Sequence, residues 1–271
     1  MTMNRVIRWI TGKTLWLFFG LAMILFLLAP VVFTAVYSLG ESRYFQFPPQ
    51  AWSLQWYSAF LHADKFYDAL INSAILAVVV TPLCLLAALP TAHALARYRF
   101  AGQRWIDALV LSPLIVPGVI TGVALLSLFR ILHQDIGLVR MSVAMLVVCF
   151  PYALRALAAN YQGVDPATEE AARDLGYGPL RTWWAITLPQ LRTGLLAGAI
   201  FVFVEVIDNF SVNVFLVDLH SDTLPIAAYQ HIRDVDDPLV AVMSTLLSVL
   251  SVLLVLAFSR MLGLERMFKS R

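Results

Sequence analysis

The chain has 271 residues, of which 60% are hydrophobic and 13% are charged, and its net charge is +2. Its mean hydropathy of +0.78 is too high for a soluble domain of this length and indicates a membrane protein. The small net charge does not favour nucleic acid as a partner. Cys84 and Cys149 lie in different apolar segments without the spacing of a disulfide or a metal site, so we expect them to be packing residues.

Six apolar segments are each long enough to cross a bilayer as a helix, which needs about 20 residues. The first is too long for a cleaved signal peptide, and no small-residue cleavage site follows it closely. No other segment is long enough for a separate soluble domain. We therefore expect residues 1–271 to form one all-α transmembrane domain with six spans. These are Leu15–Tyr37, Leu70–Ala96, Trp105–Phe129, Leu138–Ala159, Thr193–Leu216 and Leu239–Met261.

The third span and the outer loops carry further local signals. Pro113 and Pro117, with two nearby glycines, predict a kinked or broken helix in the third span. The loop Ser38–Ala69 is rich in aromatic residues, as is common at a membrane surface. The loop Asp218–Pro238 is acidic, which fits either contact with an external partner or a solvated loop. Asn72, which opens the second span, is expected to make contacts at a helix end rather than to bind solute.

The segment between the fourth and fifth spans has the pattern E-A-A-x3-G-x9-I-x-L-P. Asp165 can cap a helix that begins at Pro166, because proline needs no amide partner at a first helical position. Gly176 stands where a left-handed stop is needed, and a second helix is expected from about Pro179 to a point before Pro189. The sequence therefore predicts a helix–glycine–helix hairpin. One face of its first helix is predicted to hold Ala167, Ala171, Ala172 and Leu175.

This pattern resembles the loop that defines the membrane subunits of binding-protein-dependent ABC importers. With the segments Phe47–Tyr57 and Ser112–Gly122, the whole chain resembles permeases of the spermidine/putrescine type. The resemblance implies a type I ABC importer permease fold, whose cytoplasmic coupling hairpin contacts an ATPase. An ordinary loop helix packed on its own bundle is the alternative. The implied coupling residues are Glu170, Ala171, Ala172, Gly176, Ile186, Leu188 and Pro189.

The resemblance also implies the rest of the assembly. The partners would be a cytoplasmic ABC ATPase dimer, an external substrate-binding protein and a second permease, which is either a different subunit or a second copy. The chain has no nucleotide-binding motif, so it would bind no cofactor itself, and the ATPase would bind ATP and magnesium. The location implied is the bacterial inner membrane, with the lipid bilayer as surroundings and no nucleic acid. The solute would be small, such as a polyamine.

A polar group interrupts the fifth span. Its first member, Glu205, lies about 20 Å along the helix from Arg192, near the middle of the bilayer. An acid at this depth costs at least about 2.5 kcal/mol on insertion scales, so it should face a cavity or a partner. We interpret the group as a translocation surface that attracts cations, with hydrogen bonding between helices as the alternative. Its members, expected on one helix face, are Glu205, Asp208, Asn209 and Asn213.

Two other functions compete with the importer hypothesis. A proton- or ion-coupled secondary transporter would use Glu205 and Asp208 as ion sites but would not need the hairpin. An intramembrane enzyme would need a catalytic pair. The five histidines are scattered and form neither a zinc motif nor a paired-aspartate protease arrangement. We therefore expect a chain that is not an enzyme.

The distribution of basic residues predicts that both termini are cytoplasmic. This orientation places 14 of the 19 Lys and Arg residues inside, as the positive-inside rule requires. A single cysteine placed in the Asp218–Pro238 loop, in a chain lacking Cys84 and Cys149, should react with an impermeant reagent added from outside. Reaction only from the cytoplasmic side would contradict the orientation. The basic residues left outside are Arg43, Lys65, Arg130, Arg140 and Arg233.

Overall fold

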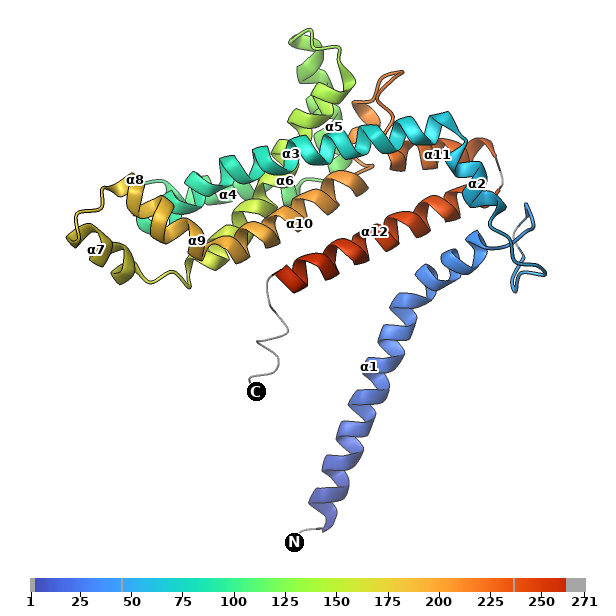
Figure 1. Ribbon diagram of the computed structural model, residues 1–271, viewed down its shortest axis with the longest axis horizontal. Helices are drawn as coiled ribbons and strands as arrows, with labels where there is room; N and C mark the ends of the chain where they lie inside the picture. The colour runs from blue at the N-terminus through green and yellow to red at the C-terminus, as the bar shows by residue number, and fades with distance from the viewer. Residues whose placement is uncertain (1–2, 45, 236, 262–271) are drawn as a thin grey trace. The chain divides into compact units, whose positions relative to one another are not determined.

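The computed structural model describes residues 3–44, 46–235 and 237–261 (Figure 1). Residues 1–2 and 262–271, the chain ends of the topology prediction, lie outside the described residues. The described residues are mostly helical, with one isolated antiparallel bridge between Gly40 and Trp52. The α-helices are α1 (Met3–Ser38), α2 (Gln55–Leu61), α3 (Asp64–Arg97), α4 (Gln103–Ile115), α5 (Gly118–Ile131), α6 (Gly137–Tyr161), α7 (Pro166–Asp174), α8 (Pro179–Thr182), α9 (Leu188–Gln190), α10 (Arg192–Asp208), α11 (Leu224–Asp234) and α12 (Leu239–Met261).

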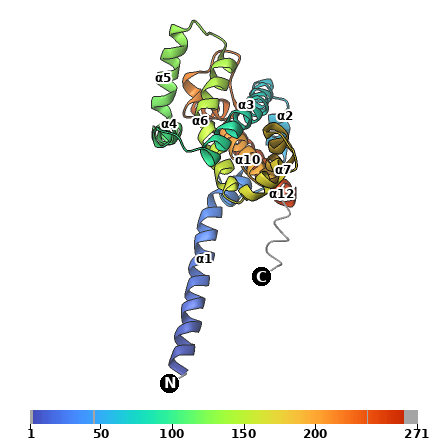
Figure 2. The same cartoon turned by 90° about the vertical axis from the view of Figure 1, so that its left-hand side faces the viewer.

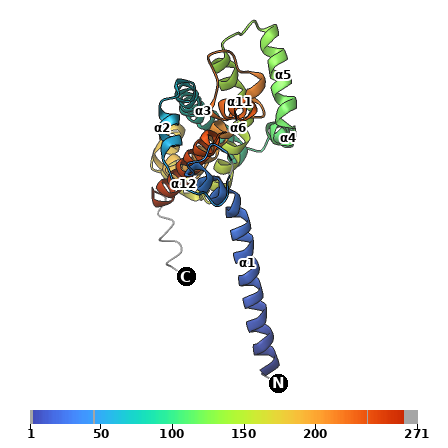
Figure 3. The ribbon, with the colours of Figure 1, turned by 90° about the vertical axis from the view of Figure 1, so that its right-hand side faces the viewer.

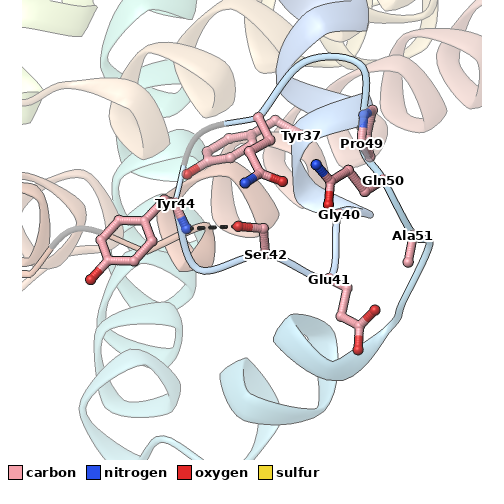
Figure 4. A pocket seen from close by; sticks show the side chains of 9 residues that line it. Tyr37, Gly40, Glu41, Ser42, Tyr44, Pro49, Gln50 and Ala51 are labelled. Carbon is pink, nitrogen blue, oxygen red and sulfur yellow. Dashed lines mark hydrogen bonds between the residues drawn. The ribbon is translucent and has the colours of Figure 1, made fainter.

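Contacts divide the chain into two compact units, which are described separately. The first comprises Met1–Ala63 and His231–Leu250, and the second comprises Asp64–Gln230 and Ser251–Arg271. In the first unit the chain folds back on itself after α1, and the buried hydroxyl of Ser38 bonds to the Tyr57 hydroxyl at 2.8 Å. The fold-back forms a pocket of about 280 Å³ (Figure 4). Its lining includes Tyr37, Glu41, Ser42, Tyr44 and Gln50.

The core of the second unit is a bundle of α3, α6 and α10, which lie side by side (Figure 1). Small residues allow the helices to approach closely, as in other membrane bundles. A side chain at Gly198 of α10 would lie 3.1 Å from Leu85 of α3, which shows how near these helices pass. Cys84 and Cys149 are fully buried in this core with free thiols, so their prediction as packing residues is confirmed.

The described helices match the predicted spans in part. Three are long and apolar enough to cross a membrane unbroken: Leu15–Ser38 of α1, α3 and α6. Two further candidates are helix pairs bent at a break, α4 with α5 and Pro179–Gln190 with α10. The sixth predicted segment forms α12, whose described apolar part is the shorter stretch Leu239–Leu253.

The third predicted span is two helices that meet at an angle of 105° (Figure 2). Val116 is extended, as expected for a residue before proline, and Pro117 ends the helical hydrogen bonding. The predicted break is therefore present. α5 then packs through glycines against the short 3₁₀ helix η2 (Asn213–Phe215). The bend between α4 and α5 is also visible from the opposite side (Figure 3).

The fifth predicted span is not one continuous helix, and this expectation was wrong. α10 ends at Asp208, and the chain continues through extended Asn209 to η2. The Asn209 side chain accepts a hydrogen bond from the Val212 N–H at 3.1 Å. Asparagine side chains compete with the helix for backbone groups in this way, which explains why the helix stops here.

We predict that Gly122→Ala in α5 destabilises the second unit by about 1–3 kcal/mol, as overpacking typically does. The new Cβ would lie 2.7 Å from Phe215 Cδ2 and 3.0 Å from the Val212 carbonyl oxygen, so backbone would have to shift. Gly20→Ala in α1 is the control, because nothing lies within 4 Å of its added methyl. Thermal unfolding in detergent measures both variants, and equal midpoints would contradict the prediction.

Candidate coupling hairpin and translocation surface

The first arm of the hairpin, α7, begins as predicted. Asp165 Oδ1 accepts a hydrogen bond from the Ala167 N–H at 2.9 Å, and Pro166 is the first helical residue. The side chain thus satisfies one of the amides that a helix start leaves without a partner. The Thr168 N–H adds a bond to the Asp165 carbonyl oxygen at 3.1 Å. The start of the arm is therefore fixed by its first few residues.

Gly176 ends this arm in the left-handed region, with φ of +88°, which confirms the predicted stop. Its N–H bonds to the Arg173 carbonyl oxygen at 2.9 Å, and the Tyr177 N–H bonds to that of Ala172 at 3.0 Å. These two bonds make a Schellman motif, which satisfies the last carbonyls of the helix. No atom lies within 4 Å of a Cβ added to Gly176, so within this chain the glycine is needed for its backbone conformation alone.

The second arm differs from the prediction, because it does not end before Pro189. It runs through α8, the π-helical turn η1 (Trp183–Thr187) and α9, and reaches Gln190. A π turn bonds residues five apart and so changes the hydrogen-bond register next to Pro189. The missing N–H of proline is tolerated at the start of the next helical segment, as at any first turn.

The outer surface of the hairpin is partly apolar. Three large side chains, Leu175, Leu180 and Trp184, are exposed by 82%, 75% and 62%. Ala171 and Ala172 do not share one helix face as predicted, because Ala172 packs inward while Ala171 is exposed. Of the predicted coupling residues, Glu170, Ala171, Gly176 and Pro189 are exposed, Ile186 and Leu188 are half-buried, and Ala172 is buried.

The acid that anchors the hairpin is Glu169, which is not among the predicted coupling residues. Arg97, the last residue of α3, donates from Nε to Glu169 Oε2 at 2.9 Å and from Nη2 to Oε1 at 3.2 Å. The Thr187 hydroxyl donates to the same Oε1 at 2.7 Å. The Glu169 and Arg97 side chains are only 6% and 17% exposed. This group, the Arg97–Glu169–Thr187 clamp, therefore joins both arms of the hairpin to α3.

Electrostatics keep the clamp charged. Burial acts to raise the pKa of Glu169, but the hydrogen bonds from Arg97 and Thr187, with the guanidinium charge, outweigh it and hold the pKa below its ordinary value. A third Arg97 hydrogen bond, from Nη2 to the Val164 carbonyl oxygen at 3.1 Å, holds the chain just after α6. A sequence signal was present, since Glu169 lies one turn before the inward Ala172 on α7.

Aromatic residues surround the clamp. The Tyr161 hydroxyl at the end of α6 accepts a hydrogen bond from Trp183 Nε1 at 3.3 Å and lies 3.2 Å from His93 Nδ1. The Arg97 guanidinium carbon lies 5.7 Å from the centre of the Tyr161 ring, within the range of cation–π attraction. Helices α3, α6 and the second arm of the hairpin therefore meet in one polar and aromatic cluster.

The four predicted pathway residues lie at the end of α10 but have different surroundings. Asn209 donates from Nδ2 to Glu205 Oε1 at 2.8 Å, and its carbonyl oxygen accepts from Asn213 Nδ2 at 3.0 Å. Asn213 is fully buried. The Asp208 side chain is exposed and its carboxylate has no hydrogen-bond partner among the described residues, whereas Glu205 is half-buried. The two asparagines thus shape the turn, and the two acids carry the charge.

The described residues contain no group of three or more His, Cys, Asp or Glu side chains placed to hold a metal ion. The features of this site are thus a capped, partly apolar hairpin and two acids at an interrupted helix.

The chain is similar to known transport proteins over most of its length. The family described as binding-protein-dependent transport system inner membrane component matches residues 56–264. Putrescine transport system permease protein PotI of Escherichia coli is 29% identical over 230 residues, which cover 82% of this chain and 81% of PotI. Spermidine/putrescine transport system permease protein PotC of the same organism is 28% identical over 239 residues, covering 88% and 90%.

A further relative, matched over a shorter stretch, and a solved structure extend the comparison. Molybdate/tungstate transport system permease protein WtpB of Pyrococcus furiosus is 30% identical over 173 residues, which cover 63% of this chain and 68% of WtpB. A chain from the crystal structure of a bacterial ABC transporter involved in the import of the acidic polysaccharide alginate matches with a TM-score of 0.70 at 18% identity. It covers 94% of this chain and 96% of its own length, so the fold is shared. The chain belongs to the family of binding-protein-dependent transport system inner membrane components.

Proposed function

We propose that this chain is the permease subunit of an ABC importer for a small cationic solute of the polyamine class. The observation that carries the proposal is the clamped hairpin, which presents exposed apolar side chains at its surface. As a member of its family, the chain is a non-enzymatic component of the membrane. A separate ATPase would bind ATP and magnesium and drive the transport cycle.

The hairpin surface supports docking of an ATPase. Exposed Leu175, Leu180 and Trp184 would cost free energy in water, so a partner that covers them gains apolar burial. Glu170 and Arg181, both exposed on the hairpin, add charges that would fix the orientation of the partner. A partner held on a clamped hairpin can pass its motion to the spans, and closure of an ATPase dimer would draw two such hairpins together.

The charge at the end of α10 favours a cationic solute. The C-terminal carbonyls of a helix carry partial negative charge, and Glu205 and Asp208 add to it. Membership of the family does not decide the charge of the solute, because one relative is named for molybdate and tungstate and two for putrescine. The acids of this chain match the ammonium groups of a polyamine, and the two putrescine-named relatives support that class.

The remaining proposed partners are a second permease subunit, different or identical, and an external binding protein. α4 has no buried residue, and in α5 only Gly122 and Phe129 are buried, so both helices present apolar surface to lipid or to another subunit. Both termini are proposed to lie in the cytoplasm, as the basic residues predict. A secondary transporter, the alternative function, would leave the clamped hairpin without a role.

We predict that Gly176→Val abolishes solute uptake while the chain still inserts into the membrane. Valine strongly resists the left-handed conformation, and its side chain would also meet a docked ATPase. Glu170→Ala should weaken stimulation of the ATPase. The matched control is Gly102→Val, because Gly102 also has a positive φ of +89° and free space around it but lies outside the hairpin. Wild-type uptake by the Gly176 variant in vesicles would contradict the coupling role.

We predict that Asp208→Asn and Glu205→Gln each lower uptake of a cationic solute about tenfold or more without loss of assembled complex. One ion pair in a partly dry pathway contributes more than about 1 kcal/mol, the value in bulk water. The control is Asp107→Asn, which changes a half-buried acid on α4. Uptake and complex yield are measured together in reconstituted vesicles. A reduced yield of complex would indicate a structural role for the two acids. Normal uptake and normal yield in the double variant, Glu205→Gln with Asp208→Asn, would exclude both the pathway role and the structural role.

A further inference from the structure

Helix α3 is attached at its last residue and, in its third turn, at Asn72 and Ser73 to segments that lie far from each other in the sequence. At its cytoplasmic end, Arg97 forms the clamp with Glu169 and Thr187 of the hairpin. The guanidinium bonds both carboxylate oxygens, a geometry that fixes direction as well as distance. Because the pair is shielded from water, a tilt of the hairpin relative to α3 would break charged hydrogen bonds that water cannot replace at once.

In the third turn of α3, two side chains hold the outer loop that follows η2. Asn72 donates from Nδ2 to the carbonyl oxygens of His220 and Asp222, at 3.0 Å each. Ser73, which is buried, accepts a hydrogen bond from the Leu224 N–H at 2.8 Å. These contacts attach residues 220–224 directly to α3. Asn72 makes structural contacts as predicted, but it lies in the third turn of α3, which begins at Asp64, and not at a helix end.

The outer loop is also attached to α6, the main packing partner of α3. Asp218 accepts hydrogen bonds from the Gly137 N–H at 2.6 Å, where α6 begins, and from the His220 N–H at 3.0 Å. A Cβ on Gly137 would overlap Ser221 and Asp218, so helix and loop are in close contact. Between its two ends α3 has fully buried residues such as Leu76, Val80 and Cys84, which pack in the bundle core.

We propose that α3 carries the movement of the hairpin to the outer loop, with the Arg97–Glu169–Thr187 clamp as its input and Asn72 and Ser73 as its output. This inference rests on the proposed function, because the hairpin moves only if an ATPase drives it. Asn72 and Arg97 are 25 positions apart, which is roughly 37 Å of helix at about 1.5 Å per residue. The clamp residues are positioning residues and touch no solute.

The chain supplies a matched control for the clamp. Arg155 of α6 and Asp107 of α4 form another ion pair, also near the predicted cytoplasmic side, at 3.9 Å. Their side chains are 56% and 46% exposed, and the pair does not involve the hairpin. Exposed pairs of this kind contribute little to structure, so removing this one should leave transmission unchanged.

The experiment uses the complete importer complex reconstituted in lipid vesicles. A spin label is placed at Leu219→Cys, a site on the outer loop that is 95% exposed, in a chain without Cys84 and Cys149. Label mobility is recorded with and without a non-hydrolysable ATP analogue, and uptake and ATP hydrolysis are measured on the same vesicles. The clamp variants are Glu169→Gln, which keeps the volume of the side chain, and Arg97→Met. The control variants are Asp107→Asn and Arg155→Met.

We expect the wild type and both control variants to show a nucleotide-dependent change in label mobility. In both clamp variants this change should be lost, and uptake per ATP hydrolysed should fall about tenfold, within the usual range of coupling between sites. A purely structural role would lower the yield of complex instead, with normal coupling in the complexes that form. If neither single variant yields complex, the same measurements are made on the double variant Arg97→Met with Glu169→Met, which leaves no unpaired buried charge.

Two failures are distinguishable. Normal label response and normal coupling in the clamp variants, with ATP-driven uptake in the wild type, would overturn the role of α3 alone. A wild-type chain that binds no ATPase would overturn the proposed function, and the inference that rests on it.

Discussion

The constraint on which this structure depends is that each interruption of a spanning helix must satisfy its backbone within protein, because lipid offers no hydrogen bonds. After Asp208 the helix breaks, and the Asn209 side chain there bonds the Val212 N–H. The glycines of α5 let that helix pack closely against η2, which covers the broken segment with protein. The segment broken at Pro117 and the segment broken after Asp208 thus pack against each other. The exposed acid Asp208 is held at the point where the helix has to stop.

In the hairpin, some residues fix the backbone geometry, and others are left exposed at the surface. The Schellman turn at Gly176 and the Asp165 cap define the first arm, and the clamp holds both arms to α3. The apolar side chains of Leu175 and Leu180 are left exposed. A surface of this kind is preorganised, so a partner that binds it has little conformational entropy to remove.

Much of the hairpin could be predicted from sequence, because caps and glycine stops act over a few residues. The Asp165 cap and the Gly176 turn are of this kind. The bend at Pro117 was predicted for the same reason. The end of α10 was not, because its polar residues were expected on one face of a continuous helix, and the sequence does not show that the Asn209 side chain will bond the Val212 amide instead. Glu169 was missed because its role depends on Arg97, 72 residues earlier in the chain.

The free space around Gly176 separates two requirements that are usually combined at a glycine turn: the backbone conformation and the space for a side chain. Within this chain nothing lies near an added Cβ, so backbone conformation is the only internal requirement. Asparagine adopts the left-handed region far more readily than other side chains. The solute uptake that remains in a Gly176→Asn variant would therefore depend on how closely a neighbouring subunit approaches the turn, because the backbone conformation of the turn is kept. Because the positive φ of Gly176 is its only internal requirement, a substitution that tolerates this φ tests how much space the interface leaves at the turn.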